Sequence, residues 1–481
     1  MKLLDLPLEL LLIILCCCDV SSVMSASQTN KILHDLASSH IMWISLVEDL
    51  RHRGFVDRLS AADVRAMPTL DLVAVVRRLV LGPAAWSPAQ SSAERPSRSA
   101  SHVKLRPAMS PGHPFSQQDV VVLPRGEHVL LNNSRGLECW RVTDGVLVWR
   151  YESDRVQAFA ADVQDGGESA NLVICIGGAP PNHQGVRIVN LNFSTGVAQP
   201  LLQTDFVGGT FYLVDPVTPR IFGDFAAVRL QSQSFVVFDW RSQAYCKVGE
   251  SASHRIALDF IPGHFIATSH ERIEVYSMAA LAGRWVLAEG PVDLDETKTV
   301  ALGRHISPVI ADSVRPKARE YPTVVVAVQP SPLVHRTFRV WIFLHPTRPQ
   351  FPGCRGKGRQ DDDEPVHLSC FRLGLGPDRA PAALVGAGES KPAPPLQLHR
   401  LKTFRTPREV RCITYAGHTL ATTDRDHQWA ISRATLTPSG SWESVGLVKL
   451  KRRPHIAPVV TTYSGAVAYV ARRSLIVQYF E

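Results

Sequence analysis

The run Asp361-Asp362-Asp363-Glu364 gathers four side chains that could hold a metal ion. Carboxylate oxygens are ligands that Ca²⁺ and Mg²⁺ prefer, so a divalent cation is one interpretation. The run lacks the spaced acceptors of an EF-hand loop and follows a Gly- and Arg-containing stretch. A solvated acidic loop is therefore the favoured interpretation.

Other residues that carry chemistry are scattered. The eighteen histidines contain no i, i+4 pair beside an acid, and the nine cysteines contain no C-x-x-C pair. No G-x-S-x-G, P-loop, G-x-G-x-x-G or H-E-x-x-H motif occurs. We therefore predict no enzymatic activity, no cofactor and no metal site. Free, singly placed cysteines are typical of a reducing compartment, which predicts a cytoplasmic or nuclear protein.

The charge is uneven along the chain. The net charge is +8, yet residues 1–83 are near neutral, so the basic excess lies in the remainder. The densest basic run is Lys449, Lys451, Arg452 and Arg453. Aromatic residues do not interleave with it as they would on a base-stacking surface, so a solvated basic face is favoured and no nucleic acid partner is predicted.

Residues 1–83 carry helical periodicity throughout. Trp43, Leu46, Val47 and Leu50 recur at the spacing of one buried helical face, and Gly54 suits the end of that helix. A later helix is predicted to end at Gly82-Pro83, and Thr29 is predicted to cap an earlier one. This segment is therefore predicted to be a small all-α domain.

A more specific pattern opens this segment. Leu6-Pro7-Leu8-Glu9-Leu10 leads an apolar run, Asp19–Val23 marks a turn into a second helix, and Asn30-Lys31 and then Met42-Trp43 follow. In this order and spacing the residues resemble an F-box, with the core motif at about 3–50. Leu33 stands where many F-boxes have an aromatic residue, and it remains apolar.

The resemblance implies binding to Skp1, and through Skp1 to a cullin, by apolar side chains of the first helices. The implied partner-binding residues are Leu6, Pro7, Glu9, Leu10, Ile14, Leu15, Val20 and Val23. By contrast, Leu33, Leu36, Leu46 and Leu50 are predicted to pack inside the helical domain, as is Trp43.

Residues 1–27 have a second interpretation. Lys2 precedes the nine-residue apolar run Leu10–Cys18, and small residues follow, as in a secretory signal. Asp5, Pro7 and Glu9 stand where the apolar stretch should begin, and the run is too short to span a bilayer. The signal interpretation therefore stays an alternative, and no membrane partner is predicted.

Residues 84–115 are rich in Pro, Ser and Ala and have no periodicity. Such composition is typical of an extended tether. We predict a flexible linker here.

Residues 116–481 have the sequence pattern of short strands separated by turns that contain Gly, Pro, Asn and Asp. The clearest unit runs from His128 to Trp149, with an Asp-Gly hairpin at 144–145. Similar middle strands recur along the chain; the first two intervals are 49 residues (185−136 and 234−185) and the last is 46 (473−427). Intervals in the forties suit four-stranded propeller blades. The predicted middle strands are 136–142, 185–190, 234–239, 271–276, 337–343, 427–432 and 473–479.

The interval from 337 to 427 is 90 residues (427−337), which is about two units of the first and last intervals. His367–Leu375 is predicted to be the middle strand of an additional unit in this interval, between disordered insertions near 353–365 and 376–396. The prediction is a seven- or eight-bladed β-propeller that resembles WD40 or quinoprotein-like repeats. Two β-sandwich domains are the alternative.

Together these features predict an F-box adaptor of a Skp1–cullin ubiquitin ligase, with a small all-α domain followed by a large all-β domain. The propeller would bind a protein substrate on loops at one face or in the central channel, because loops on a rigid scaffold carry function. Two alternatives remain. One is a secreted or membrane-tethered propeller, and the other is an F-box scaffold without a ligase role.

Overall fold

The computed structural model of this chain describes residues 3–86, 101–107 and 120–480, with gaps inside the last range. The gaps are 134–135, 154–155, 178–183, 208–218, 231–233, 251–255, 295, 315–322, 346–365, 377–395, 407–412, 423–427, 435, 437–441, 451–457, 464 and 472–473. The acidic run 361–364, the basic residues 451–453 and the predicted insertion 353–365 lie outside the described residues, as does 376–396 except at its two ends.

The N-terminal region is entirely helical, as predicted. Its elements are η1 (Leu3–Asp5), α1 (Leu8–Cys16), α2 (Val20–Ser27), α3 (Lys31–Ala37), α4 (His40–His52), α5 (Ala61–Ala66), α6 (Thr69–Leu81) and the short η2 (Ala84–Trp86).

Local sequence explains where these helices begin and end. The carboxylate of Asp19 accepts a hydrogen bond from the Ser22 backbone N–H and starts α2. Asn30, not the predicted Thr29, caps α3, because its side chain accepts from the Ile32 N–H. Gly82 ends α6 with φ +81°, a conformation that favours glycine.

One core holds the helices together. The stripe on α4 is buried as predicted, and it packs with Val23 of α2, Leu33 of α3 and Leu72 of α6. Trp43, Leu46, Val47 and Leu50 all belong to this core, and Leu36 packs against its edge.

The rest of the described chain forms seven sheets, most of them built from strands that follow one another in the chain. In chain order the first four-stranded sheet is β2 (Val120–Val122), β3 (His128–Asn133), β4 (Gly136–Arg141) and β5 (Leu147–Glu152). The second is β6 (Val156–Val163), β7 (Ser169–Ile176), β8 (Gln184–Asn192) and β9 (Ala198–Val207), with β18 (Val292–Asp293) added at its edge. The third is β10 (Arg220–Phe222), β11 (Phe225–Arg229), β12 (Phe235–Asp239) and β13 (Ala244–Glu250), with β17 (Val286–Leu287) and β19 (Thr299–Leu302) on its outer edge. The strands of the seven sheets pair antiparallel except at β18 and β19, which pair parallel.

Four more sheets complete the series. They are β14 (Ala257–Ile261), β15 (His264–Thr268), β16 (Arg272–Ser277) and β20 (Ile310–Ser313); β21 (Thr323–Pro330), β22 (Thr337–His345), β23 (Val366–Gly374) and β24 (Gln397–Thr406); β25 (His418–Thr422), β26 (Gln428–Ala434) and β27 (Trp442–Lys449); and β28 (Val459–Val460), β29 (Val467–Ala471), β30 (Ser474–Tyr479) and β1 (Ser101–Leu105).

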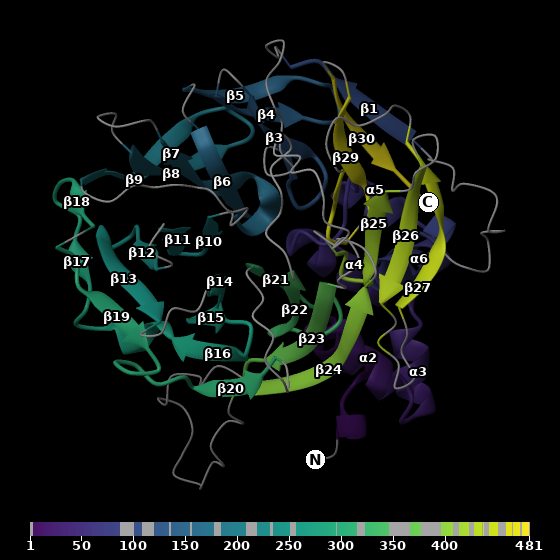
Figure 1. Cartoon of the computed structure of the whole chain (residues 1–481). Coiled ribbons are helices and arrows are strands. Elements are labelled where there is room, and N and C mark those ends of the chain that lie inside the picture. Colours follow the sequence, from purple (N-terminus) through teal and green to yellow (C-terminus); the bar gives the residue numbers. More distant parts are fainter. Residues whose placement is uncertain are drawn as a thin grey trace, which may run out of the picture.

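The sheets stand around a ring, with β10, β14 and β21 near its centre and β19, β20 and β24 at its rim (Figure 1). Each sheet contributes side chains to cores shared with its neighbours; Phe238 packs with Phe206 of the preceding sheet, for example. A ring of radially arranged antiparallel sheets is a β-propeller. The two-sandwich alternative is therefore wrong, and the fold prediction is confirmed.

Strand β1 closes the ring and corrects the predicted linker. Ser101–Leu105 pairs antiparallel with β30, so the first strand of the ring joins the last. Trp86 is also buried, against Phe480 and His418. The linker prediction for 84–115 rests on composition alone, and composition does not detect a short strand with alternating polar and apolar residues.

The doubled interval also has a different explanation. His367–Leu375 is not the middle strand of an additional unit, because β23 pairs with β22 on one side and β24 on the other, within one sheet. β23 occupies the third position of that sheet, which β4, β8 and β12 occupy in theirs. The long interval therefore reflects long connections, and the described residues form seven sheets.

The helical domain packs on one face of the ring. It contacts the turns between the first and second strands of several sheets. The Arg58 N–H donates to the Arg125 carbonyl, the Ser21 N–H donates to the Leu333 carbonyl, and the rings of Phe55 and Tyr463 meet. Such turns all lie on the same side of a propeller, because adjacent strands run antiparallel. The helices therefore lie on that face, at one side of the ring (Figure 1).

Candidate partner-binding surface on the N-terminal helices

Helix α1 has two faces of similar apolarity but different environment. Leu11 and Leu15 point into the helical domain and are buried. Leu10, Ile13 and Ile14 occupy the opposite side and are 46%, 58% and 42% exposed. Their i, i+3, i+4 spacing forms one continuous stripe. A folded domain with its own core therefore leaves a row of aliphatic side chains in water.

Other apolar side chains of the N-terminal helices are also exposed. They are Leu3 and Leu4 on η1, Leu8 at the start of α1, Met24 on α2 and Ile32 on α3. We call the set Leu3, Leu4, Leu8, Leu10, Ile13, Ile14, Met24 and Ile32 the apolar helical surface. A row of exposed apolar side chains such as Leu10, Ile13 and Ile14 is typical of a site of protein association.

Five of the eight residues implied by the family resemblance are accessible. Pro7, Glu9, Leu10 and Ile14 are exposed, and Leu6 is half-buried. Pro7 stands at the N-cap of α1 without a side-chain hydrogen bond, and Glu9 lies in the first turn, where a carboxylate suits the helix dipole. These residues flank or belong to the apolar helical surface.

The other three are not accessible, which corrects the prediction. Leu15, Val20 and Val23 are only 6%, 5% and 0% exposed and belong to the helical core. Their side chains are already enclosed by the domain's own helices, so they support the surface from beneath. Ile14 is exposed and Leu15 is buried, because neighbouring positions on a helix face different directions.

The sequence pattern did not identify six of the exposed apolar residues. They are Leu3, Leu4, Leu8, Ile13, Met24 and Ile32. A signal for Ile13 was present, because a helix that buries positions 11 and 15 must turn positions 10, 13 and 14 outwards. No comparable signal existed for Met24 and Ile32, because the packing of α2 and α3 against α1 decides their exposure.

The polar groups beside this surface have structural roles. Burial of Asp19 opposes its charge, yet hydrogen bonds from Ser22 and from the His335 N–H lower the pKa of this carboxyl. Burial and the neighbouring Asp19 charge raise the pKa of the Cys18 thiol. The lowered pKa keeps the Asp19 carboxyl charged, which suits its role as the N-cap of α2.

The described residues contain no group of three or more His, Cys, Asp or Glu side chains placed to hold a metal. Every helix in the described part of the chain is too short or too polar to cross a membrane. The cysteines that are described are free thiols.

The topology defines the chain as a β-propeller protein with a helical domain on one face of the ring. Within that class, residues 3–45 match the family model of the F-box domain. The chain therefore carries an F-box domain, followed by a β-propeller. F-box domains generally serve protein interactions rather than catalysis. No curated protein sequence matches the chain.

Solved structures with a similar arrangement include three of very different sequence. The WD40 domain of SCAP from fission yeast is 10% identical, with a TM-score of 0.39, over 76% of this chain and 82% of that domain. The computationally designed Ika8 protein is 11% identical, with a TM-score of 0.34, over 79% of this chain and 100% of the other. BamB from Moraxella catarrhalis is 12% identical, with a TM-score of 0.33, over 80% of this chain and 98% of that one.

Proposed function

We propose that the chain is a substrate-recruiting adaptor of a Skp1–cullin ubiquitin ligase, acting in the cytoplasm or nucleus. The F-box would bind Skp1, and through it a cullin, while the propeller binds a protein substrate. Ubiquitin transfer would then be promoted by proximity, with the chemistry supplied by other subunits. The observation that carries this proposal is the apolar helical surface, which lies within the F-box match.

The energetics suit a protein partner. Burying apolar area yields roughly 25 cal/mol per Å², so a few fully covered aliphatic side chains can dominate an interface. The surface carries several such side chains, and its centre on α1 contains no charge from residue 10 to residue 16. Helix-to-helix packing in a groove would cover them.

The placement of the domain supports a division of labour. The helices lie on the face of the propeller that carries the first-to-second strand turns, where the Arg53 guanidinium donates to the Ser331 carbonyl at 2.8 Å. We therefore assign the substrate to the opposite face of the ring. Direct docking of the two domains would also fix the distance between Skp1 and substrate.

The test is a pull-down of the full-length protein with purified Skp1. Ile14→Asp should abolish binding, because burying a new carboxylate in an apolar groove costs several kcal/mol. Ile14 is exposed in the free protein, so the variant should fold normally, as circular dichroism would verify. Val197→Asp is the matched control, since Val197 is 63% exposed on a propeller turn. Folded wild-type protein that does not bind Skp1 would refute the proposal.

A further inference from the structure

A strap crosses the rim of the propeller between two neighbouring sheets. After β17 pairs with Ala244 and Tyr245 of β13, the chain leaves that edge and pairs as β18 with Phe206 and Val207 of β9. It then returns to β13 as β19, in parallel pairing. We call residues 288–298 the rim strap, and Asp295 within it lies outside the described residues.

The rim strap is fixed rather than mobile. Val292 and Leu294 are buried in the core that the second and third sheets share. The Leu294 N–H donates to the Val207 carbonyl, and the Lys247 ammonium donates to the Leu294 carbonyl at 2.7 Å. The Tyr245 hydroxyl also lies 3.4 Å from the Thr297 hydroxyl. Any site beneath the strap is therefore preformed.

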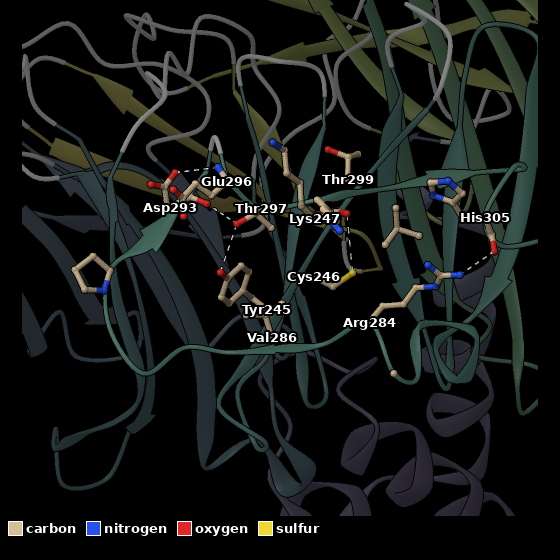
Figure 2. Close-up of a pocket in the computed structure, with 14 residues that line it drawn as sticks. Tyr245, Cys246, Lys247, Arg284, Val286, Asp293, Glu296, Thr297, Thr299 and His305 are labelled. Atoms are coloured by element: carbon tan, nitrogen blue, oxygen red, sulfur yellow. Dashed lines mark hydrogen bonds between the residues drawn. The ribbon is translucent and has the colours of Figure 1, made fainter.

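A hollow of about 620 Å³ lies between the rim strap and β13 (Figure 2). This volume falls within the range of ligand-binding sites. Its floor contains the buried side chains of Tyr245, Cys246 and Val300, and the exposed Val286 and Pro291 line it as well. The hollow thus has an apolar middle.

The two ends of the hollow differ in charge. Asp293 and Glu296 lie at one end, and Arg284 and His305 lie at the other, with Lys247 between them (Figure 2). Within the described part of the chain, neither Arg284 nor Lys247 forms an ion pair; each donates instead to a backbone carbonyl. The cationic end therefore keeps its charge available to a ligand.

His305 adds a neutral donor at the cationic end. Its Nδ1 accepts a hydrogen bond from the Ala301 N–H at 2.9 Å. A ring nitrogen that accepts carries no proton, so in the neutral ring the proton is on Nε2. Nε2 can then donate to an acidic group beside Arg284.

We propose that this rim hollow binds an extended peptide segment of a partner protein, with an acidic side chain at the Arg284 end, a basic side chain at the Asp293 end and apolar residues between. The acid pair at one end repels the continuous phosphates of a nucleic acid, and the described residues that line the hollow include no row of exposed aromatic rings for base stacking. The hollow is open along exposed residues such as Pro291 and Lys298, which suits a segment that continues into a larger protein.

The site is separate from the proposed Skp1 surface. In Figure 1, β17, β18 and β19 lie across the ring from α2 and α3. Peptide binding at the rim therefore does not depend on the F-box, and the two proposals can fail independently. An Ile14→Asp variant, defective in Skp1 binding, should keep its affinity for the peptide.

The probe is a phage-displayed library of random 12-residue peptides, selected on the full-length protein. We expect an enriched family with acidic and basic ends around an apolar centre. Binding of a synthetic member, measured by fluorescence polarisation, should weaken about tenfold or more in Arg284→Glu. Replacing the acidic residues of the peptide with lysine should restore binding to that variant. Arg304→Glu is the matched control, because Arg304 is exposed nearby but does not line the hollow.

Three results would overturn the proposal. They are a selection that enriches no such family, binding that is equal in Arg284→Glu and wild type, and an equal loss in Arg304→Glu. Both variants change exposed side chains, so thermal unfolding should confirm that they are folded as the wild type is.

Discussion

The ring of Phe55, in the helical domain, stands edge-on to the ring of Tyr463, in the propeller, with centroids 4.7 Å apart and an interplanar angle of 82°. Such edge-to-face pairs are favourable beyond the area they bury. The Tyr463 hydroxyl donates to the Pro330 carbonyl at 2.7 Å. The Tyr463 side chain therefore contacts the helical domain through Phe55 and a second propeller sheet through Pro330. The helical domain and the propeller therefore share a core and are not joined by a linker alone.

Phe55→Ala should lower the free energy of unfolding of the full-length protein by about 3–5 kcal/mol, because Phe55 is almost fully buried and its loss leaves a cavity. Chemical denaturation measures this change. Val197→Ala, at an exposed site, should change it by less than about 0.5 kcal/mol. Equal values for the two variants would show that the domains do not share a core.

Strand β1 should be required for the closed ring. Leu105 is buried in the core that joins the first and last sheets, opposite Leu475 of β30. Leu105→Ala should therefore cost about 2–5 kcal/mol of unfolding free energy. His102→Ala, on the exposed side of the same strand, is the control. Thermal unfolding of both variants tests this, and an unaffected Leu105→Ala would argue against closure by β1.

Adjacent residues of the F-box should separate binding from stability. Leu15→Ala should cost about 2–5 kcal/mol of stability, because Leu15 is in the core. Ile13→Ala should leave stability nearly unchanged and weaken Skp1 binding, because Ile13 is exposed. Denaturation and calorimetric titration with Skp1 measure the two effects. The reverse pattern would contradict the assignment of the two faces of α1.

His418 should make the protein less stable at acidic pH. Burial, and then the charge of Arg433, lower its pKa to about 3. In the unfolded chain its pKa is about 6.5, so below that pH only the unfolded state takes up the proton. The stability that neutral His418 contributes is therefore present above pH 6.5 and is lost as the pH falls towards 3.

The expected slope is about 1.4 kcal/mol per pH unit over that window. His418→Gln should remove this component, so the difference in unfolding free energy between wild type and variant should change with pH. The control is His102→Gln, which replaces an exposed histidine by the same residue. A difference that is constant from pH 7 to pH 4 would contradict the prediction.

Cysteine reactivity should follow burial. Burial raises the pKa of Cys139, Cys175 and Cys370 to about 12, whereas Cys17 is exposed at the end of α1. The thiolate is the reactive form, so an alkylating reagent at pH 8 should label Cys17 well before the three buried thiols. Mass spectrometry of the labelled protein measures the order, and early labelling of Cys175 would show that the ring opens.

The sequence by itself determined the helices, their buried stripes and the repeating strands. Periodicity on α4 and the Asp-Gly turn at 144–145 are local properties, encoded within a few residues of where they act. The F-box likewise lies in one continuous stretch, 3–45, so its order and spacing could be read directly.

Only the tertiary structure decided which distant segments pair or pack with one another. Ser101–Leu105 is placed in a sheet by its pairing with β30, whose residues lie 370 (475−105) to 378 (479−101) positions later in the chain. The third position of β23 depends on which neighbours it pairs with, not on its own apolar residues. The same holds for the outward turn of Met24 and for the charged ends of the rim hollow, which strands from two sheets assemble. Long-range contacts of this kind depend on packing, and packing is invisible to any pattern confined to a short window.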